Sequence, residues 1–324
     1  MRIAILGCGS IGYRHLKNLQ TLGYTDLIGL DPMQSARDRV ESELGITCFF
    51  DIDDLWAVKP NVALVTAPSN LHLELAKAAV RNRCHLFIEK PLSHSMKGWD
   101  ELLKEIGKRE LITMVGCNMR FHPGLSIVKS LIDRRAVGQV IAARIQSSSY
   151  LPEWRPWQDY RQSYSASPEW GGAILDCIHE IDVALWYFGA ASVIGAARLP
   201  ARTIGLETDG LAEAIMCHES GVLSNLHLSF VQRDYRRNCQ IIASEGTIYW
   251  DWGDRQVKVY GSDGNLAEVL TEPDGWTKNQ MYIDELTHFL ESVQNRTSTI
   301  NPISGGLAAL EIALAIRQKN LLTN

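Results

Sequence analysis

The sequence predicts an α/β protein with a doubly wound parallel sheet at its N-terminus and an α+β domain after it. Three observations predict this fold class. An apolar strand at residues 3–6 runs directly into a glycine-rich turn and then into a helical pattern. Strands and helices then alternate as far as residue 116. Between residues 193 and 260, strand-like runs follow one another without helices, which is typical of an antiparallel sheet.

The glycine-rich turn has the spacing of a dinucleotide-binding site. It reads Gly7-Cys8-Gly9-Ser10-Ile11-Gly12. Gly7 permits the tight turn, Gly9 lets the backbone approach a pyrophosphate, and Gly12 lets the helix lie close to the strand. The phosphates then accept hydrogen bonds from the free N–H groups at the helix N-terminus. The first strand, turn and helix therefore predict a Rossmann-type unit.

The second strand, at residues 27–30, ends in Asp31, about 20 positions after the glycines. A carboxylate at this place accepts hydrogen bonds from the adenosine ribose and repels a 2′-phosphate, so it favours NAD. Arg37 and Arg39 follow closely and could accommodate NADP. The alternative is that Asp31 only begins a turn with Pro32.

The rest of the first domain continues the alternation. We expect helices over 34–44, 71–81 and 95–108, a short acidic helix or turn over 51–58, and strands over 46–50, 61–66, 85–88 and 111–116. Right-handed crossovers then give a parallel sheet that is covered on both faces. Functional loops lie at the carboxyl ends of such strands, which places candidate sites at 7–12, Asp31, 66–72, 89–91 and Asn118.

The pattern changes from His122 onward. We expect a helix over 125–135, a strand over 140–145, a polar and aromatic segment over 147–169 and a helix over 173–188. Strands are expected over 193–199, 211–218, 222–230, 237–244, 247–252 and 257–260, and a last helix over 306–321. We place the first domain at residues 1–119, the second at 120–303, and a C-terminal helical segment near the first domain at 304–324.

Composition limits the function classes. The 324 residues suffice for two domains, and a net charge of −5 with 21% charged residues indicates no nucleic-acid partner. No apolar run approaches the roughly 20 residues that span a bilayer, and the first strand begins at once, so we expect a cytoplasmic protein with small-molecule partners and no membrane association. The seven cysteines are scattered, so we expect reduced thiols and no metal site.

Glu89-Lys90-Pro91 follows a predicted strand at the carboxyl edge of the sheet. A lysine there would face the nicotinamide, where its amino group can hydrogen-bond a substrate oxygen and exchange a proton with it. The alternative is a surface ion pair between Lys90 and Glu89.

Asp176 and His179 are expected three residues apart on one face of a single helix, with Glu180 four residues from Asp176. An imidazole can exchange a proton with a reacting hydroxyl, and a nearby carboxylate can orient it. Taken alone, a histidine on such a helix is more often structural than catalytic.

The segment from Tyr150 to Tyr164 is unusually aromatic for a connection. Aromatic faces stack on sugar rings, and charged side chains bind hydroxyls, carboxylates or phosphates. Core packing or an oligomer interface is an equal alternative. The substrate-binding candidates from this segment are Trp154, Trp157, Tyr160 and Arg161.

Together these motifs resemble the glucose-fructose oxidoreductase/inositol dehydrogenase/MocA (Gfo/Idh/MocA) family. In chain order they are the glycine turn 7–12, Ala67-Pro68-Ser69-Asn70-Leu71-His72, Glu89-Lys90-Pro91, Asn118-x-Arg120-Phe121, and Gly171-Gly172 with Asp176 and His179. The resemblance implies an NAD(P)-binding Rossmann domain, a C-terminal domain with a large open sheet, and homodimers or homotetramers built through that sheet. It also implies hydride transfer at a secondary carbon of a sugar, cyclitol or sugar derivative.

The site expected on these grounds has three parts. Lys90, Asp176 and His179 would be catalytic, with Lys90 holding the reacting oxygen, His179 exchanging its proton and Asp176 positioning one or both. Arg120 would join Lys90, Asp176, His179 and the aromatic candidates in binding substrate. The cofactor would be held by Gly7, Gly9, Ser10, Ile11, Gly12, Asp31, Thr66, Pro68, Asn70, His72, Glu89, Lys90 and Asn118.

The leading hypothesis is therefore an NAD(P)-dependent oxidoreductase acting on the CH–OH group of a sugar, sugar nucleotide or cyclitol. In many family members the aspartate and histidine are four residues apart rather than three, which leaves their division of roles open. This spacing and the aromatic segment look similar to relatives associated with bacterial surface-sugar biosynthesis. Two alternatives remain: a cofactor-binding sensor without turnover, and a glycoside-processing enzyme that uses transient oxidation by bound NAD.

Overall fold

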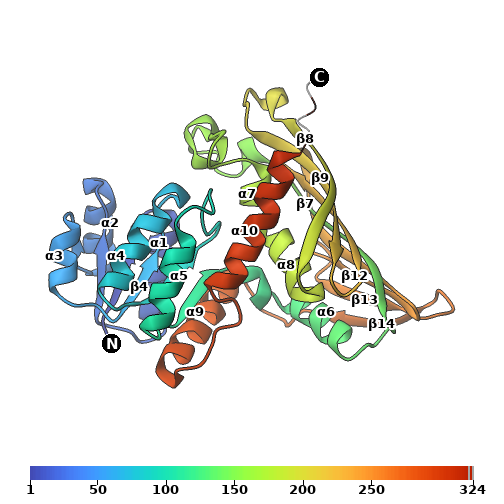
Figure 1. Cartoon of the computed structure of the whole chain (residues 1–324), viewed down its shortest axis with the longest axis horizontal. Helices are drawn as coiled ribbons and strands as arrows, with labels where there is room; N and C mark the ends of the chain where they lie inside the picture. Colours follow the sequence, from blue (N-terminus) through green and yellow to red (C-terminus); the bar gives the residue numbers. More distant parts are fainter. Residues whose placement is uncertain (320–321, 323–324) are drawn as a thin grey trace. The chain divides into compact units, whose positions relative to one another are not determined.

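The chain forms two compact units in the computed structural model, which describes residues 1–319 and residue 322 (Figure 1). The first unit comprises Met1–Asn118 and Thr277–Leu307, and the second comprises Met119–Trp276 and the chain from Ala308 on. Each unit is built on one sheet. No helix within the described part of the chain has the length and apolar character needed to cross a membrane.

The sheet of the first unit is parallel throughout, in the order β3-β2-β1-β4-β5-β6. This order is that of a doubly wound fold, and it confirms the predicted α/β class. The strands are almost wholly apolar because helices cover both faces. Their bounds are β1 (Ile3–Leu6), β2 (Leu27–Leu30), β3 (Cys48–Phe49), β4 (Val62–Val65), β5 (His85–Glu89) and β6 (Thr113–Gly116).

Helices of the first unit follow the predicted alternation with two differences. The helix expected over 95–108 begins only at Trp99, and the chain from Lys278 to Asn295 forms a helix that was not predicted. The helices are α1 (Ser10–Thr21), α2 (Gln34–Leu44), α3 (Ile52–Ala57), α4 (His72–Arg81), α5 (Trp99–Lys108) and α9 (Lys278–Asn295).

The structure places Thr277–Leu307 in the first unit, whereas we expected residues as far as 303 in the second domain. The reason is that α9 packs against α1 and β5 of the first unit. Its Asn279 donates a hydrogen bond to Asn18 of α1 over 2.8 Å, and its Phe289 ring lies 5.6 Å from that of Phe87 in β5. Ile303, which begins α10 (Ile303–Gln318), also belongs to the core of this unit. The predicted end of the last helix, at residues 320 and 321, lies outside the described residues.

The second unit holds an eight-stranded sheet in the order β14-β13-β12-β11-β7-β10-β9-β8. All neighbouring pairs are antiparallel except β7 and β10, so the predicted mostly antiparallel sheet is confirmed. The strands are β7 (Val140–Tyr150), β8 (Ala191–Pro200), β9 (Asp209–His218), β10 (Leu223–Ser229), β11 (Val231–Ala243), β12 (Gly246–Asp251), β13 (Gln256–Tyr260) and β14 (Leu266–Thr271).

One face of this sheet is packed by helices α6 (Pro123–Asp133), α7 (Ala173–Asp176) and α8 (Ile178–Phe188), as Figure 1 shows. The single helix predicted over 173–188 is wrong, because the chain breaks at Cys177, where ψ is 27°. Asp176 therefore ends α7, while His179 lies in the first turn of α8. The expected polar segment also starts later, since β7 continues to Tyr150.

Candidate active site

The glycine turn leaves β1 at the switch point of the first sheet, where β1 and β4 lie side by side and the strand order reverses. Gly7 has a φ of +108°, and a Cβ there would lie 2.7 Å from the Ala67 nitrogen. A Cβ on Gly12 would lie 1.9 Å from the Gly7 oxygen. Both positions are therefore closed to any side chain.

Gly9 differs from these two glycines, because a Cβ built on it meets no atom within 4 Å. Gly9 is also the N-cap of α1, and no side chain caps this helix end. The N–H groups of the first turn are therefore not taken up by a cap, and the backbone beside them opens to free space. This arrangement fits a pyrophosphate, with Ser10 and Ile11 in the first turn.

Asp31 is buried at the end of β2 and accepts two backbone hydrogen bonds. Cys8 N donates to its Oδ2 over 2.7 Å, and Met33 N donates to its Oδ1 over 2.8 Å. Asp31 thus begins a turn and also holds the glycine turn in place. Arg37 donates to the Asp31 carbonyl over 2.7 Å, and Arg39 donates to the Cys8 carbonyl over 3.1 Å. Both guanidinium groups therefore bind backbone carbonyls at Asp31 and in the glycine turn.

The loop after β4 is tied to the same turn. The Thr66 hydroxyl donates to the Gly7 carbonyl over 2.6 Å. His72 is buried, with Nε2 2.7 Å from the Ala67 carbonyl and Nδ1 3.2 Å from the Leu92 carbonyl. Burial lowers the pKa of His72, while the hydrogen bonds to the two carbonyls act in the opposite direction. The ring joins this loop to the segment after Lys90. Pro68 and Asn70 are exposed, and Asn118 is buried.

Glu89 ends β5 and forms a buried pair with His15 of α1. His15 Nε2 lies 2.7 Å from Glu89 Oε1, and the Lys90 backbone N–H donates to Glu89 Oε2 over 3.1 Å. The side-chain exposures are 0% for His15 and 9% for Glu89, so this carboxylate is not at the surface. Lys90 is half-buried and follows a strand end that is fixed from both sides.

Tyr282 of α9 lies in the same region. Its ring centroid is 6.1 Å from that of His15, and the Arg14 guanidinium lies 4.6 Å above it. Burial raises the pKa of Tyr282, and the Glu89 charge raises it further. Sequence reasoning missed Tyr282 because α9 itself was not predicted, and it gave His15 no role in the site.

In the second unit, buried acidic groups of α8 are bonded to arginines. Asp182 accepts two hydrogen bonds from Arg120, of 2.8 and 2.7 Å, and Glu180 accepts one of 2.7 Å from Arg237. Burial alone would lower the pKa of Arg237, but Glu180 beside it raises that pKa above its usual value. Arg120, expected to bind substrate, is therefore engaged in a bidentate pair with Asp182.

Asp176 has a different partner. Its Oδ1 accepts a hydrogen bond from the Tyr164 hydroxyl, and Asp176 and His179 are both buried. Tyr164 was noted in the aromatic segment but was not among the expected site residues. The signal that could have found it is the neighbouring Gly171-Gly172 pair, since a Cβ on Gly171 would lie 2.3 Å from the Tyr164 carbonyl.

Two of the candidates from the aromatic segment, Trp154 and Tyr160, contact other parts of the second unit, although 39% of Trp154 is exposed. Trp154 donates to Ser149 over 2.9 Å and stacks edge-on against Phe230, while the Tyr160 hydroxyl donates to the Ile204 carbonyl over 2.8 Å. The cavity lined by Trp154, Tyr160 and their neighbours measures about 10 Å³, which is about the room for one water molecule. Trp157 and Arg161 are exposed, and Trp157 has 82% of its surface open.

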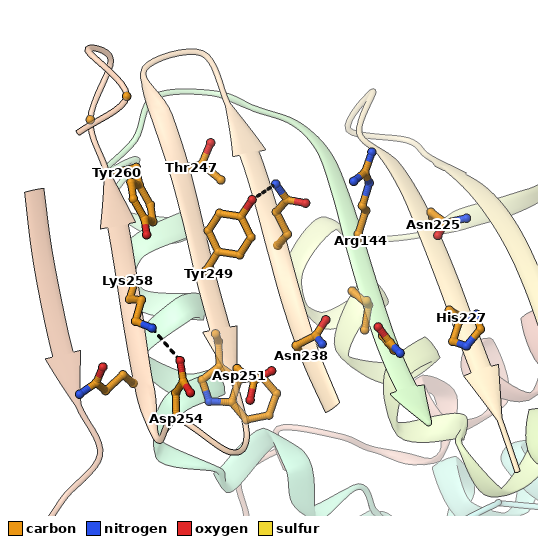
Figure 2. A pocket seen from close by; sticks show the side chains of 17 residues that line it. Arg144, Asn225, His227, Asn238, Thr247, Tyr249, Asp251, Asp254, Lys258 and Tyr260 are labelled. Carbon is orange, nitrogen blue, oxygen red and sulfur yellow. Dashed lines mark hydrogen bonds and ion pairs between the residues drawn. The ribbon is translucent and has the colours of Figure 1, made fainter. Parts of the chain in front are cut away.

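The open face of the second sheet carries a larger hollow, of about 740 Å³, which contains none of the expected site residues. Figure 2 shows its side chains rising from neighbouring strands. They form two rows across the sheet, in which paired residues face one another strand by strand. One row within the hollow is His227, Gln146, Asn238, Asp251 and Gln256, and the other is Asn225, Arg144, Gln240, Tyr249 and Lys258. Glu213 and Ile215 of β9 continue the two rows beyond the hollow.

The structure thus joins most of the expected cofactor residues in the first unit, through contacts among the glycine turn, Asp31, Thr66, His72 and Glu89. Lys90 belongs to this unit, whereas Asp176 and His179 belong to the second.

Two family models match the chain. The one described as "Oxidoreductase family, NAD-binding Rossmann fold" matches residues 1–117, and "GFO/IDH/MocA C-terminal domain" matches residues 126–249. The chain is 27% identical to scyllo-inositol 2-dehydrogenase (NAD(+)) of Bacillus subtilis, over 97% of this chain and 92% of that protein. It is 30% identical to myo-inositol 2-dehydrogenase of Thermotoga maritima, over 91% of this chain and 89% of that protein.

A solved structure gives the same result for the fold. UDP-N-acetylglucosamine 3-dehydrogenase from Acidithiobacillus ferrooxidans matches with a TM-score of 0.80 at 20% identity, over 98% of this chain and 97% of that one. The family models and the Thermotoga relative agree with the motifs found in the sequence. The chain belongs to the Gfo/Idh/MocA family of oxidoreductases, and its first unit is an NAD-binding Rossmann domain.

Proposed function

We propose that this oxidoreductase is an NAD-dependent dehydrogenase that transfers a hydride between the nicotinamide and a secondary carbon of a sugar, sugar nucleotide or cyclitol. The observation that carries the proposal is the buried pair of His15 and Glu89, which fixes the strand end from which Lys90 extends. When bound, the nicotinamide supplies the hydride acceptor or donor. The named substrates of the relatives support the carbohydrate class.

The proposed roles of the residues follow from their chemistry. Lys90 hydrogen-bonds the reacting oxygen, His179 exchanges a proton with it, and Asp176 positions one or both groups. Gly9, Ser10 and Ile11 receive the pyrophosphate at the uncapped end of α1. Trp157, which is exposed, and Tyr160, which is half-buried, remain candidates for stacking on a sugar ring.

The cofactor preference proposed is for NAD. Asp31 places a buried carboxylate beside the glycine turn, and a 2′-phosphate brought to it would meet like charge. Arg37 and Arg39 are engaged with backbone carbonyls, which supports the same preference.

We also propose that two copies of the chain associate through the open face of the second sheet. The two rows of paired side chains carry both charge signs, with Glu213 and Asp251 against Arg144 and Lys258, so a second copy could complement the first. Ile215 and Tyr249 are exposed on the same face, at 40% and 42%. We further propose a place in bacterial surface-sugar biosynthesis, on the basis of the aromatic segment.

The test is nicotinamide absorbance on mixing the protein with NAD or NADH and a panel of sugars, sugar nucleotides, cyclitols and their keto forms. We expect turnover with one class of panel member. Lys90→Met should abolish it while leaving NADH binding nearly intact, whereas the control Lys108→Met, at an exposed position on α5, should be fully active. Normal turnover by Lys90→Met would contradict the proposed role. No turnover with any panel member, despite tight NADH binding, would favour the sensor or transient-oxidation hypotheses.

A further inference from the structure

We propose that Tyr164 is a positioning residue that orients the carboxylate of Asp176 for the reaction. This inference rests on the proposed function, and it assigns a role to a residue that the motifs leave out. Tyr164 is half-buried, and its hydroxyl donates a hydrogen bond to Oδ1 of the buried Asp176. Hydrogen bonds to a carboxylate are stronger than neutral ones, so this contact restrains the rotation of the group.

The three acidic side chains between residues 176 and 182 accept hydrogen bonds from different donors. Glu180 and Asp182 are each bonded to an arginine, so each of these carboxylates faces a positive charge. Asp176 accepts a hydrogen bond from the neutral hydroxyl of Tyr164. A neutral donor orients a carboxylate without cancelling its charge, so the carboxylate can still attract a protonated imidazole or a substrate hydroxyl.

The backbone that carries Tyr164 is held against α7. Gly172 N donates to the Ser165 carbonyl over 3.0 Å, and Gly171 N donates to the Ser167 carbonyl over 3.0 Å. Gly171 has no room for a side chain, because a Cβ would lie 2.3 Å from the Tyr164 carbonyl. The absence of a Cβ at Gly171 is thus what allows Tyr164 to approach the helix that ends in Asp176.

Contacts from other elements of the second unit fix the same segment. The Thr208 hydroxyl donates to the Ser167 carbonyl over 3.1 Å. Arg317 of α10 donates to the Pro168 and Glu169 carbonyls over 2.5 and 2.8 Å, and it pairs with Asp209 over 3.0 Å. A segment fixed from β9 and α10 presents Tyr164 rigidly, as a positioning role requires.

The test compares Tyr164→Phe with a matched control, Tyr187→Phe. Tyr187 belongs to the same unit, but its hydroxyl donates to the Leu125 carbonyl over 2.8 Å, not to a carboxylate. For Tyr164→Phe we expect kcat to fall about tenfold to 100-fold, because a hydrogen bond to a charged group is lost. The KM for substrate should change less than about twofold, and NADH affinity should be unchanged. Tyr187→Phe should retain wild-type kcat.

A second variant, Gly171→Ala, displaces the Tyr164 backbone without removing any hydroxyl, and it should lower kcat in the same way. Wild-type kcat in Tyr164→Phe, or an equal loss in Tyr187→Phe, would overturn the proposal. A readout without turnover is the NMR signal of the Asp176 carboxyl carbon, assigned with Asp176→Asn in isotope-labelled protein. It should shift in Tyr164→Phe and not in Tyr187→Phe, and an unmoved signal would overturn the proposal even if no panel substrate reacts. A wild-type protein that turns over no substrate contradicts the proposed function instead.

Discussion

We predict that His122 makes the stability of the second unit depend on pH. It is the N-cap of α6, where Nδ1 accepts a hydrogen bond from Gly124 N over 3.1 Å. Its ring is enclosed by three tryptophans, with centroids 4.7 to 5.0 Å away. Burial lowers the pKa of His122 to about 3, and the positive charges of Arg237 and Arg255 contribute in the same direction. Glu272 lies 3.6 Å from Nε2, but this carboxylate is shared with Arg255 and a tryptophan N–H.

The sign of the effect follows from the two states of the protein. The unfolded chain takes up a proton at His122 near pH 6.5, whereas the folded chain does so only near about pH 3. Between these values the unfolded state binds more protons, so the free energy of unfolding falls as the pH falls. The slope is about 1.4 kcal/mol per pH unit, which gives a loss of about 2 kcal/mol by about pH 5.

The assay is urea denaturation of the wild type and of His122→Asn, each at about pH 7 and about pH 5. Tryptophan fluorescence monitors the unfolding. Asparagine is a good N-cap and does not titrate in this range, so the variant keeps the hydrogen bond to Gly124 N. We expect the wild type to lose about 2 kcal/mol more than the variant between these pH values. The other buried histidines are present in both proteins and cancel in the comparison. An equal loss in both proteins would refute the reasoning.

Three further predictions concern the two units separately. Asp31→Ala should narrow the preference for NADH over NADPH by roughly tenfold, measured from the two dissociation constants, and an unchanged ratio would mean that Asp31 acts only in its turn. His15→Leu should lower the free energy of unfolding by about 3–5 kcal/mol in urea, because Glu89 would then be buried without its partner, while a loss below about 1 kcal/mol would contradict the importance of the pair. Tyr249→Glu should convert the oligomer to monomers in sedimentation experiments, and a wild type that is itself monomeric would contradict association through the open face.

The first unit could be predicted closely from the sequence because its signals are local. The strands at residues 3–6 and 62–65 are buried on both faces and read as continuous apolar runs. The glycine turn is visible because Gly7 and Gly12 each meet a steric demand that no other residue satisfies, while Gly9 leaves open the space expected for a pyrophosphate. These features depend on residues that are neighbours in sequence.

The errors have physical causes that the structure identifies. The strand β14 was missed because Leu266–Thr271 is exposed at the sheet edge and shows no alternation of buried and exposed positions. The break at Cys177 was missed because no glycine or proline marks it within the apolar run. The position of α9 depends on contacts with α1 and β5, which lie more than half the chain away in sequence.

Two site residues that sequence reasoning missed, His15 and Tyr164, share one property. Each acts through a partner, Glu89 or Asp176, that no rule of sequence spacing connects to it. His15 and Glu89 are 74 positions apart, yet they meet because α1 packs beside the strand that Glu89 ends. The helix whose first turn is shaped for a pyrophosphate therefore also carries, five residues later, the imidazole that fixes Glu89 before Lys90. A displacement of α1 would move both features together. Cofactor binding and the presentation of Lys90 thus depend on one rigid element, and a substitution in the glycine turn should disturb both.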